Sequence, residues 1–237
     1  MQPSVPGEER WDKLQGRYGG KRVFLIGNGP SLNKMPLYLL KGEFTMCFNR
    51  FYLMAERLNW TPEFFMSVDD LVLDDLLPEL PSLAEYASYV FLPDIHFRGK
   101  RYSNRVEARE NIYWLKTIPW QGFSQDLPEV HIGGSVIYEG LQVLNYLGFK
   151  EIYLIGVDMD FSPQESAERL GGDRASVRGE KDDDPNHFDP RYFGKDRSYH
   201  DPEPHVVRFI LNSLEMAANT APSLGCRIIN AGVDSRV

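Results

Sequence analysis

Short apolar runs alternate with amphipathic stretches along most of the chain. One run, within KEIYLIGVDM, is apolar throughout and is typical of a centre strand in a parallel sheet. Similar runs predict further strands over 22–26, 44–48, 63–67, 88–92, 112–118 and 226–231. Because helical segments separate these runs, the sequence predicts an α/β, Rossmann-like, doubly wound, mostly parallel sheet flanked by helices.

Helical periodicity is clearest in two segments. Apolar residues recur at three- and four-residue spacing from Val136 to Leu147, and Gly148 ends that predicted helix. A second amphipathic helix is expected over 204–218. Shorter helical turns are expected over 37–40, 53–58 and 71–86, the last broken by two prolines.

The chain is expected to form one domain with two irregular regions. Residues 1–20 are polar and predict a loose N-terminal arm with one helical turn near 11–14, and 21–237 predict a single nucleotide-binding domain. Residues 162–202 are rich in Asp, Pro, Gly and Arg. A polar stretch of this length predicts a functional, lid-like insertion.

Composition narrows the classes of partner. Of the 237 residues, 42% are hydrophobic, and the net charge of −8 disfavours nucleic acid as a partner. The basic cluster around Arg98 and Arg105 is small, and we interpret it as a solvated loop.

Cys47 and Cys226 lie in apolar runs without metal-ligand spacing, which indicates buried thiols in a reducing compartment. No apolar run reaches the ~18 residues of a transmembrane helix. We therefore expect a cytoplasmic protein, with peripheral membrane contact and an oligomer left open.

The glycine turn after the first strand resembles a nucleotide-binding turn but departs from the known fingerprints. Gly27 and Gly29 match the start of a dinucleotide motif, whereas Leu32 occupies the third glycine and Asn49 stands where an acid should bind ribose. No phosphate-binding P-loop is present in the sequence. We expect Asn28 and Ser31 to supply side-chain contacts, although a plain strand-to-helix turn would explain the same residues.

A second glycine site precedes the best helix. Gly133, Gly134 and Ser135 lie where a helix N-terminus offers free N–H groups to an anion. A serine N-cap with glycine spacers is the structural alternative.

Carboxylates and histidines complete the candidate chemistry. Asp69, Asp158 and Asp160 follow predicted strands and could converge on Mg²⁺ carrying phosphates, or simply cap turns. His200 in the insertion is a candidate general base, with a surface loop histidine as the alternative. Tyr192 and Tyr199 lie in the same segment and could hold phosphate once a loop closes.

Four segments, in this order, resemble one superfamily: IGNGPSLN, CFNRFY, GGSVIYEGLQVLNYLGFKEIYLIGVDMDF and NHFDPRYFGKDRSYHDP. They are similar to the family named after the archaeal 6-hydroxymethylpterin diphosphokinases (MptE-like). The same core resembles the Campylobacter-type bacterial sialyltransferases and the central domain of the flagellin-modifying motility-associated factors. The resemblance covers roughly residues 20 to 232.

The resemblance implies roles for several residues. Asn28 and Asn49 match asparagines that bind the nucleotide-activated donor, and His200 matches the base that deprotonates the acceptor hydroxyl. Gly133, Gly134 and Ser135 match a segment that binds the nucleotide. Asp160 replaces a tyrosine that stabilises the leaving phosphate in the metal-free sialyltransferases, and the extra acids suit Mg²⁺ and a di- or triphosphate.

Three hypotheses follow. The first is a glycosyltransferase-like enzyme that transfers a sugar from a CMP-sugar donor to a hydroxyl-bearing glycan in surface polysaccharide synthesis. In this hypothesis His200 is the base, and Tyr192 or Tyr199 steadies the leaving phosphate. The second is a diphosphokinase with ATP, Mg²⁺ on the three aspartates and a pterin acceptor. The third is a non-catalytic nucleotide-binding module of a glycosylation assembly.

Overall fold

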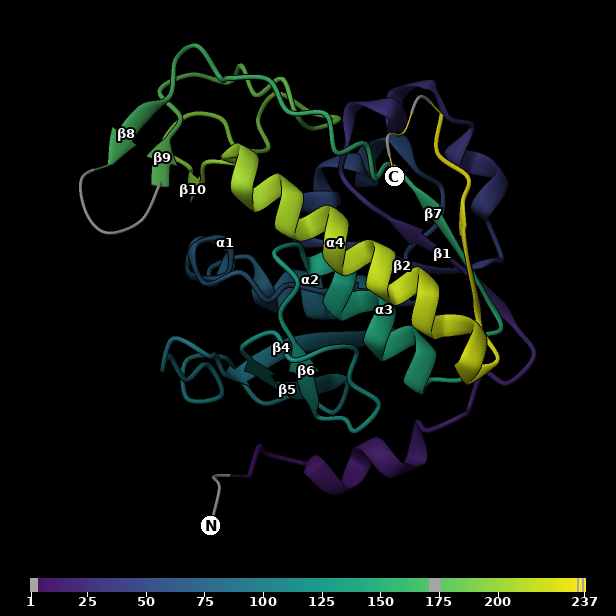
Figure 1. The fold of residues 1–237 in the computed structure, drawn as a ribbon. Coiled ribbons are helices and arrows are strands. Elements are labelled where there is room, and N and C mark those ends of the chain that lie inside the picture. Colours follow the sequence, from purple (N-terminus) through teal and green to yellow (C-terminus); the bar gives the residue numbers. More distant parts are fainter. Residues whose placement is uncertain (1–3, 171–175, 234, 236) are drawn as a thin grey trace.

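The apolar runs form one parallel sheet. The computed structural model describes residues 4–170, 176–233, 235 and 237, and within them eight strands pair in the order β11-β7-β1-β2-β3-β4-β5-β6 (Figure 1). Every pairing in this sheet is parallel, so the predicted fold class is confirmed. The strands are β1 (Arg22–Ile26), β2 (Phe44–Phe48), β3 (Phe64–Met66), β4 (Tyr89–Ile95), β5 (Ile112–Ile118), β6 (Glu129–His131), β7 (Glu151–Ile155) and β11 (Arg227–Asn230). Of these, β6 was not predicted.

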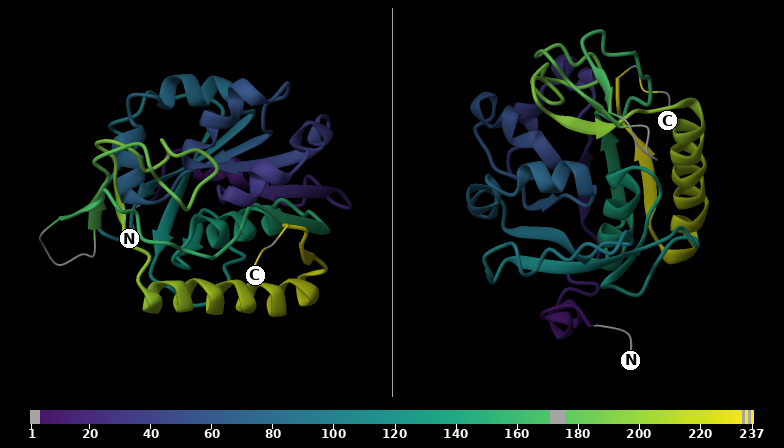
Figure 2. Two further views of the ribbon diagram at one scale, coloured as in Figure 1. Left: turned by 90° about the horizontal axis from the view of Figure 1, so that it is seen from above. Right: turned by 90° about the vertical axis from the view of Figure 1, so that its left-hand side faces the viewer.

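Helices cover both faces of the sheet (Figure 2). One face carries α3 (Val136–Tyr146) and α4 (Pro204–Thr220), which is followed by η5 (Ala221–Leu224). The opposite face carries η2 (Pro30–Lys34), η3 (Leu37–Leu40), η4 (Asn49–Arg57), α1 (Asp70–Leu76) and α2 (Leu80–Tyr86). Successive strand residues supply the two cores, since Leu25 packs with α3 and Ile26 packs on the other side. None of the helices in the described ranges has both the length and the apolarity needed to cross a bilayer.

The N-terminal residues differ from the expected loose arm. The short 3-10 helix η1 (Glu8–Lys13) inserts Trp11 into the α3-side core, where Trp11 is 1% exposed and its Nε1 donates to the Trp114 carbonyl at 3.1 Å. Leu14 and Tyr18 are buried in the same core. These three large side chains anchor the segment to the sheet. The polar residues between them are the reason that the sequence did not predict the anchoring.

The polar insertion folds back over the carboxyl ends of the sheet. It contains a small antiparallel sheet of β8 (Glu168–Leu170), β9 (Ser176–Arg178) and β10 (Ser198–His200), which the polar sequence did not predict. Phe188 and Tyr192 are buried, and the Phe188 amide donates to the Asn28 carbonyl at 2.9 Å. Asn33 Nδ2 donates in turn to the Phe188 carbonyl at 2.9 Å. The insertion is therefore attached to the first glycine turn.

Candidate active site

A cavity of about 700 Å³ opens at the carboxyl ends of the strands. It lies where the turns after β1 and β7 meet, the point at which the strand order reverses. Doubly wound sheets bind their ligands at this switch point. Twelve of the residues singled out from the sequence line the cavity: Gly27, Asn28, Gly29, Asn49, Asp69, Gly134, Ser135, Asp158, Asp160, Tyr192, Tyr199 and His200. Ser31 and Gly133 are not among the lining residues.

The first two glycines are required by packing between the two turns. A Cβ at Gly27 would lie 2.3 Å from the Gly156 carbonyl oxygen, and one at Gly29 would lie 2.3 Å from Asp158 Oδ2. Ser31 continues this contact, because its amide and its hydroxyl donate to the two carboxylate oxygens of Asp158 at 2.9 and 2.5 Å. Asp158 and Ser31 thus hold the two turns together at the base of the cavity.

Two asparagines at the ends of β1 and β2 leave buried acceptors at the cavity. Asn28 Nδ2 donates to the Phe48 carbonyl at 3.3 Å and to the Tyr192 hydroxyl at 3.0 Å, which fixes the orientation of the amide. Asn28 Oδ1 and Asn49 Oδ1 are buried without a hydrogen-bond partner. Asn49 also has a left-handed backbone (φ 52°), as does Met159, which lines the same cavity. Strained backbones of this kind cluster at functional sites.

The start of α3 is organised by its own side chains. Ser135 is the N-cap, and its hydroxyl accepts from the Ile137 amide at 3.4 Å. The Gly133 amide donates to Glu139 Oε1 at 3.1 Å, so it is not directed at an anion. Gly134 adopts φ 82°, and a Cβ there would lie 2.9 Å from the Phe209 ring. Gly134 and Ser135 therefore line the cavity at the start of α3. The Gly133 amide instead forms a hydrogen bond within the protein, to Glu139.

His200 lies at the end of β10 among charged groups. Its Nε2 is 3.1 Å from Arg98 Nη1 and 3.8 Å from the nearest carboxylate oxygens of Asp69 and Asp70. A guanidinium can only donate, so the contact with Arg98 is a hydrogen bond when Nε2 carries no proton. In that form Nε2 is the atom that can accept a proton once another group displaces Arg98.

Asp70 is the buried centre of this charged cluster. Its side chain is 1% exposed and forms ion pairs with Arg98 at 2.7 Å and Lys100 at 2.9 Å. Burial raises the pKa of the Asp70 carboxyl, but hydrogen bonds and charges from His200, Lys100 and Arg98 outweigh it and hold the pKa below its usual range. The basic segment around Arg98 was interpreted from the sequence as a solvated loop. The structure corrects this, because the segment neutralises a buried acid beside His200.

The two tyrosines have different surroundings. The Tyr192 hydroxyl lies next to Asn28, and its ring stacks on His187 with centroids 3.8 Å apart. The Tyr199 hydroxyl instead donates to Gln164 Oε1 at 2.7 Å, and its ring stacks on Phe193. Burial raises the pKa of both phenols. Tyr192 is therefore the better placed of the two to contact a ligand.

Two of the three aspartates expected to bind Mg²⁺, Asp69 and Asp158, already have hydrogen-bond partners within the protein. In the part of the chain that the structure describes, the only cluster of three ligand groups within 4.8 Å comprises Asp69, Asp70 and His200. Asp158 is occupied by Ser31, and Asp69 Oδ1 caps α1 by accepting from the amides of residues 71 and 72. Two cations already neutralise Asp70. A divalent ion would have to displace these partners.

Sequence reasoning gave no role in the site to Arg98 and Glu139, which both line the cavity. Arg98 lies in a loop that only tertiary structure brings to His200. Glu139 has a weak signal in the sequence, because it is an acid inside an otherwise apolar helical segment. It is 2% exposed, and its Oε2 has no hydrogen-bond partner.

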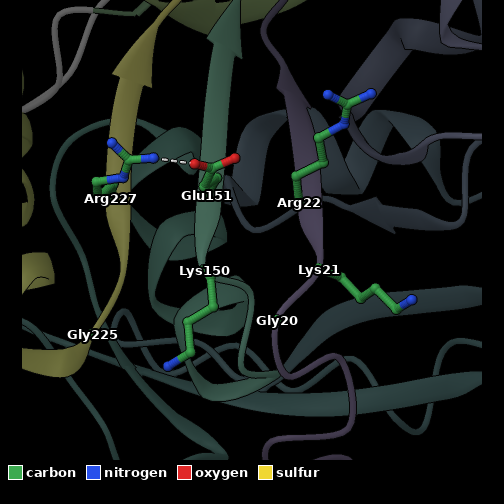
Figure 3. Close-up of a pocket in the computed structure, with 7 residues that line it drawn as sticks. All are labelled: Gly20, Lys21, Arg22, Lys150, Glu151, Gly225 and Arg227. Atoms are coloured by element: carbon green, nitrogen blue, oxygen red, sulfur yellow. Dashed lines mark hydrogen bonds and ion pairs between the residues drawn. The ribbon is translucent and has the colours of Figure 1, made fainter.

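A second cavity, of about 570 Å³, lies at the opposite end of the sheet (Figure 3). It is lined by Gly20, Lys21, Arg22, Lys150, Glu151, Gly225 and Arg227, at the amino ends of β1, β7 and β11. The side chains of Lys21 and Lys150 point away from each other, and Arg227 is paired with Glu151. Arg22 is paired with Glu43 at 2.5 Å. This crevice is an exposed, salt-bridged surface without convergent groups.

Comparisons with known proteins agree with this architecture. The sequence model of a family described as 6-hydroxymethylpterin diphosphokinase MptE-like matches residues 3–164. No protein of curated function matches the chain. The MAf glycosyltransferase from Magnetospirillum magneticum AMB-1 has a similar structure, with a TM-score of 0.52, 16% identity, and coverage of 97% of this chain and 36% of that one. The sialyltransferase CstII from Campylobacter jejuni, in complex with CMP-3FNeuAc, aligns with a TM-score of 0.38 and 16% identity over 59% of this chain and 63% of that one. At 16% identity the likeness to the MAf protein concerns the fold alone, and the chain spans about a third of that protein's length.

Proposed function

The chain belongs to the 6-hydroxymethylpterin diphosphokinase MptE-like family, and from this premise we propose that it is a glycosyltransferase-like enzyme that uses a nucleotide-activated sugar. The proposed donor is a CMP-sugar, and the proposed acceptor is a hydroxyl group of a glycan in surface polysaccharide or glycoconjugate synthesis. The glycosyltransferase fold of the MAf protein is consistent with this proposal.

One observation carries the proposal: the buried, unpartnered oxygens of Asn28 and Asn49 at the switch-point cavity. A buried acceptor without a partner destabilises a protein by roughly 1–3 kcal/mol. Two such atoms on neighbouring strands suit a ligand that brings several hydroxyl donors, as a ribose or a sugar does. The cavity volume of about 700 Å³ is in the range of small-molecule sites.

In the proposed reaction His200 Nε2 takes the proton of the acceptor hydroxyl. The hydroxyl oxygen then bonds to the anomeric carbon of the sugar, and the nucleotide phosphate leaves with the electrons of the broken bond. Arg98 pairs with His200 in this structure and is the cation nearest to it. In this proposal Arg98, once displaced from Nε2, stabilises the leaving phosphate. Tyr192 lines the same cavity and assists.

The diphosphokinase alternative draws on the family description and on the cluster of Asp69, Asp70 and His200. It needs ATP and a divalent ion held by carboxylates. The occupied state of Asp158 and the two cations on Asp70 speak against that arrangement. We therefore place the metal-dependent reaction second.

Binding of nucleotides with and without metal separates the two. We would measure thermal stabilisation by CMP, CDP, ATP and GDP, each with and without Mg²⁺. Stabilisation by CMP in the presence of a chelator is the expected result. Stabilisation by ATP only when Mg²⁺ is present would overturn the proposal in favour of the kinase. Binding of CMP without turnover of any CMP-sugar would point to a nucleotide-binding module instead.

A further inference from the structure

Glu139 is a buried acid at the cavity that none of the three hypotheses uses. It lies in the first turns of α3, and the Gly133 amide fixes its Oε1 at 3.1 Å. The whole residue is 2% exposed, yet it lines the cavity, and its Oε2 has no hydrogen-bond partner. A buried carboxyl group with one oxygen anchored and the other without a partner is poised for a ligand atom.

The protonation state of Glu139 follows from its surroundings. Burial raises its pKa to about 8, and the negative charge of Asp69 acts in the same direction, while hydrogen bonds from its own amide and from Gly133 oppose the shift. At pH 7 the group is therefore mostly a neutral acid. Because the Gly133 amide donates to Oε1, the acid proton resides on Oε2. The free oxygen is then a hydrogen-bond donor.

The cavity wall beside Glu139 is apolar. Ile137 and Val136 from α3 and Phe209 and Ile210 from α4 line it, and the last two lie within 3 Å of a Cβ built on Gly134. Such a wall accepts the flat face of an aromatic ring, whereas the amide oxygens of Asn28 and Asn49 suit hydroxyl groups. Glu139 lines the same cavity and is therefore available to the polar edge of a ring placed there.

We infer that Glu139 selects the base of the bound nucleotide. Oε2–H donates to a ring nitrogen that carries no hydrogen. Cytosine and adenine present such a nitrogen next to their exocyclic amino group. Uracil and guanine present a ring N–H at the same place, so that two donors would face each other. The inference rests on the proposed nucleotide-binding function and specifies the class of base.

Two substitutions of Glu139 test this assignment. Glu139→Gln keeps a donor at the free position, because its carbonyl oxygen can face the Gly133 amide and its NH₂ group can face the ligand. Glu139→Leu keeps the volume but removes both polar atoms. Glu215→Gln, on the exposed side of α4, is the matched control. Circular dichroism and thermal melting would verify that each variant is folded.

Isothermal titration with CMP, AMP, UMP and GMP gives the readout. The wild type and Glu139→Gln should bind CMP or AMP at least about tenfold more tightly than UMP and GMP, because a buried polar group left unpaired is heavily penalised. Glu139→Leu should lose that preference. If Glu139→Leu retains the wild-type preference, or lowers the affinity for all four nucleotides equally, the inference is wrong while the proposed function stands. If the wild type binds none of the four, the proposed function fails first.

Discussion

The two ends of the same parallel sheet carry polar cavities of opposite character. At the amino end, charged side chains are exposed and paired with each other, as in Arg22–Glu43 and Arg227–Glu151. At the carboxyl end, side chains are buried, and Asn28, Asn49 and Glu139 each keep an oxygen without a partner. Exposed ion pairs contribute little energy, whereas buried unpaired groups are costly. The candidate site is therefore distinguished by buried polar atoms without a hydrogen-bond partner, and not by its density of charge.

The largest expected effect is on catalysis at the carboxyl end. His200→Ala removes the proposed base and should lower turnover of a CMP-sugar by about 10²–10⁴-fold, with nucleotide affinity retained. The measurement is steady-state transfer or donor hydrolysis alongside calorimetric binding of CMP. Lys150→Gln at the amino end is the control and should leave turnover unchanged. Turnover within a few-fold of wild type for His200→Ala would remove His200 from the reaction.

The next effect concerns stability and pH. The native Glu139 acid, with a pKa of about 8, keeps its proton through a range in which the unfolded chain has lost it. The native state thus binds more protons, so stability falls as pH rises toward 8 and changes no further above that value. Glu139→Gln lacks this dependence.

We therefore expect the stability of Glu139→Gln, relative to that of the wild type, to increase by roughly 3–4 kcal/mol between pH 5 and pH 8. Chemical denaturation at several pH values measures the difference. Glu215→Gln, an exposed change on α4, should parallel the wild type at every pH. Parallel curves for Glu139→Gln and the wild type would mean that Glu139 is not a neutral acid in the native state.

A smaller effect is expected from the amide of Asn49. Asn49→Gly removes the buried acceptor and tolerates φ 52° without strain, so nucleotide affinity should fall by about tenfold, near 1.4 kcal/mol, while the fold is kept. Asp196→Gly is the matched control, since Asp196 has a similar φ of 65° and is not among the residues that line the cavity. Unchanged CMP affinity in Asn49→Gly would leave its unpartnered oxygen without a ligand role.

The sequence predicted much of the fold because its apolar runs are strong. The strands at 22–26, 44–48 and 112–118 have the predicted bounds, and the helix starting after Ser135 is present. The short strands β6 and β8–β10 were missed, because three-residue pairings carry almost no periodic signal. The buried Trp11 shows the same limit, since one aromatic residue in a polar stretch gives no period.

The candidate site was partly predictable, for a related reason. Strand ends converge at one edge of a parallel sheet, so Asn28, Asn49 and Asp69 could be placed together from the sequence. What each group does there depends on its neighbours. Both carboxylate oxygens of Asp158 accept hydrogen bonds from Ser31. Arg98 contacts His200 from a loop that is 102 residues away in the sequence. Such pairings follow from packing and leave no local pattern.

The smallest expected effect is at the amino end of the sheet, where the comparison of the two cavities predicts no change in CMP affinity. Lys21 and Lys150 line the exposed crevice, and their side chains point away from each other (Figure 3). Anion binding needs convergent donors with little access to water, and a single exposed ammonium group is screened by salt. The double variant Lys21→Gln/Lys150→Gln should therefore bind CMP with unchanged affinity and melt at the wild-type temperature. A loss of CMP affinity in this variant would mean that the crevice binds nucleotide. Buried polar atoms without a hydrogen-bond partner would then no longer distinguish the nucleotide site from the other end of the sheet.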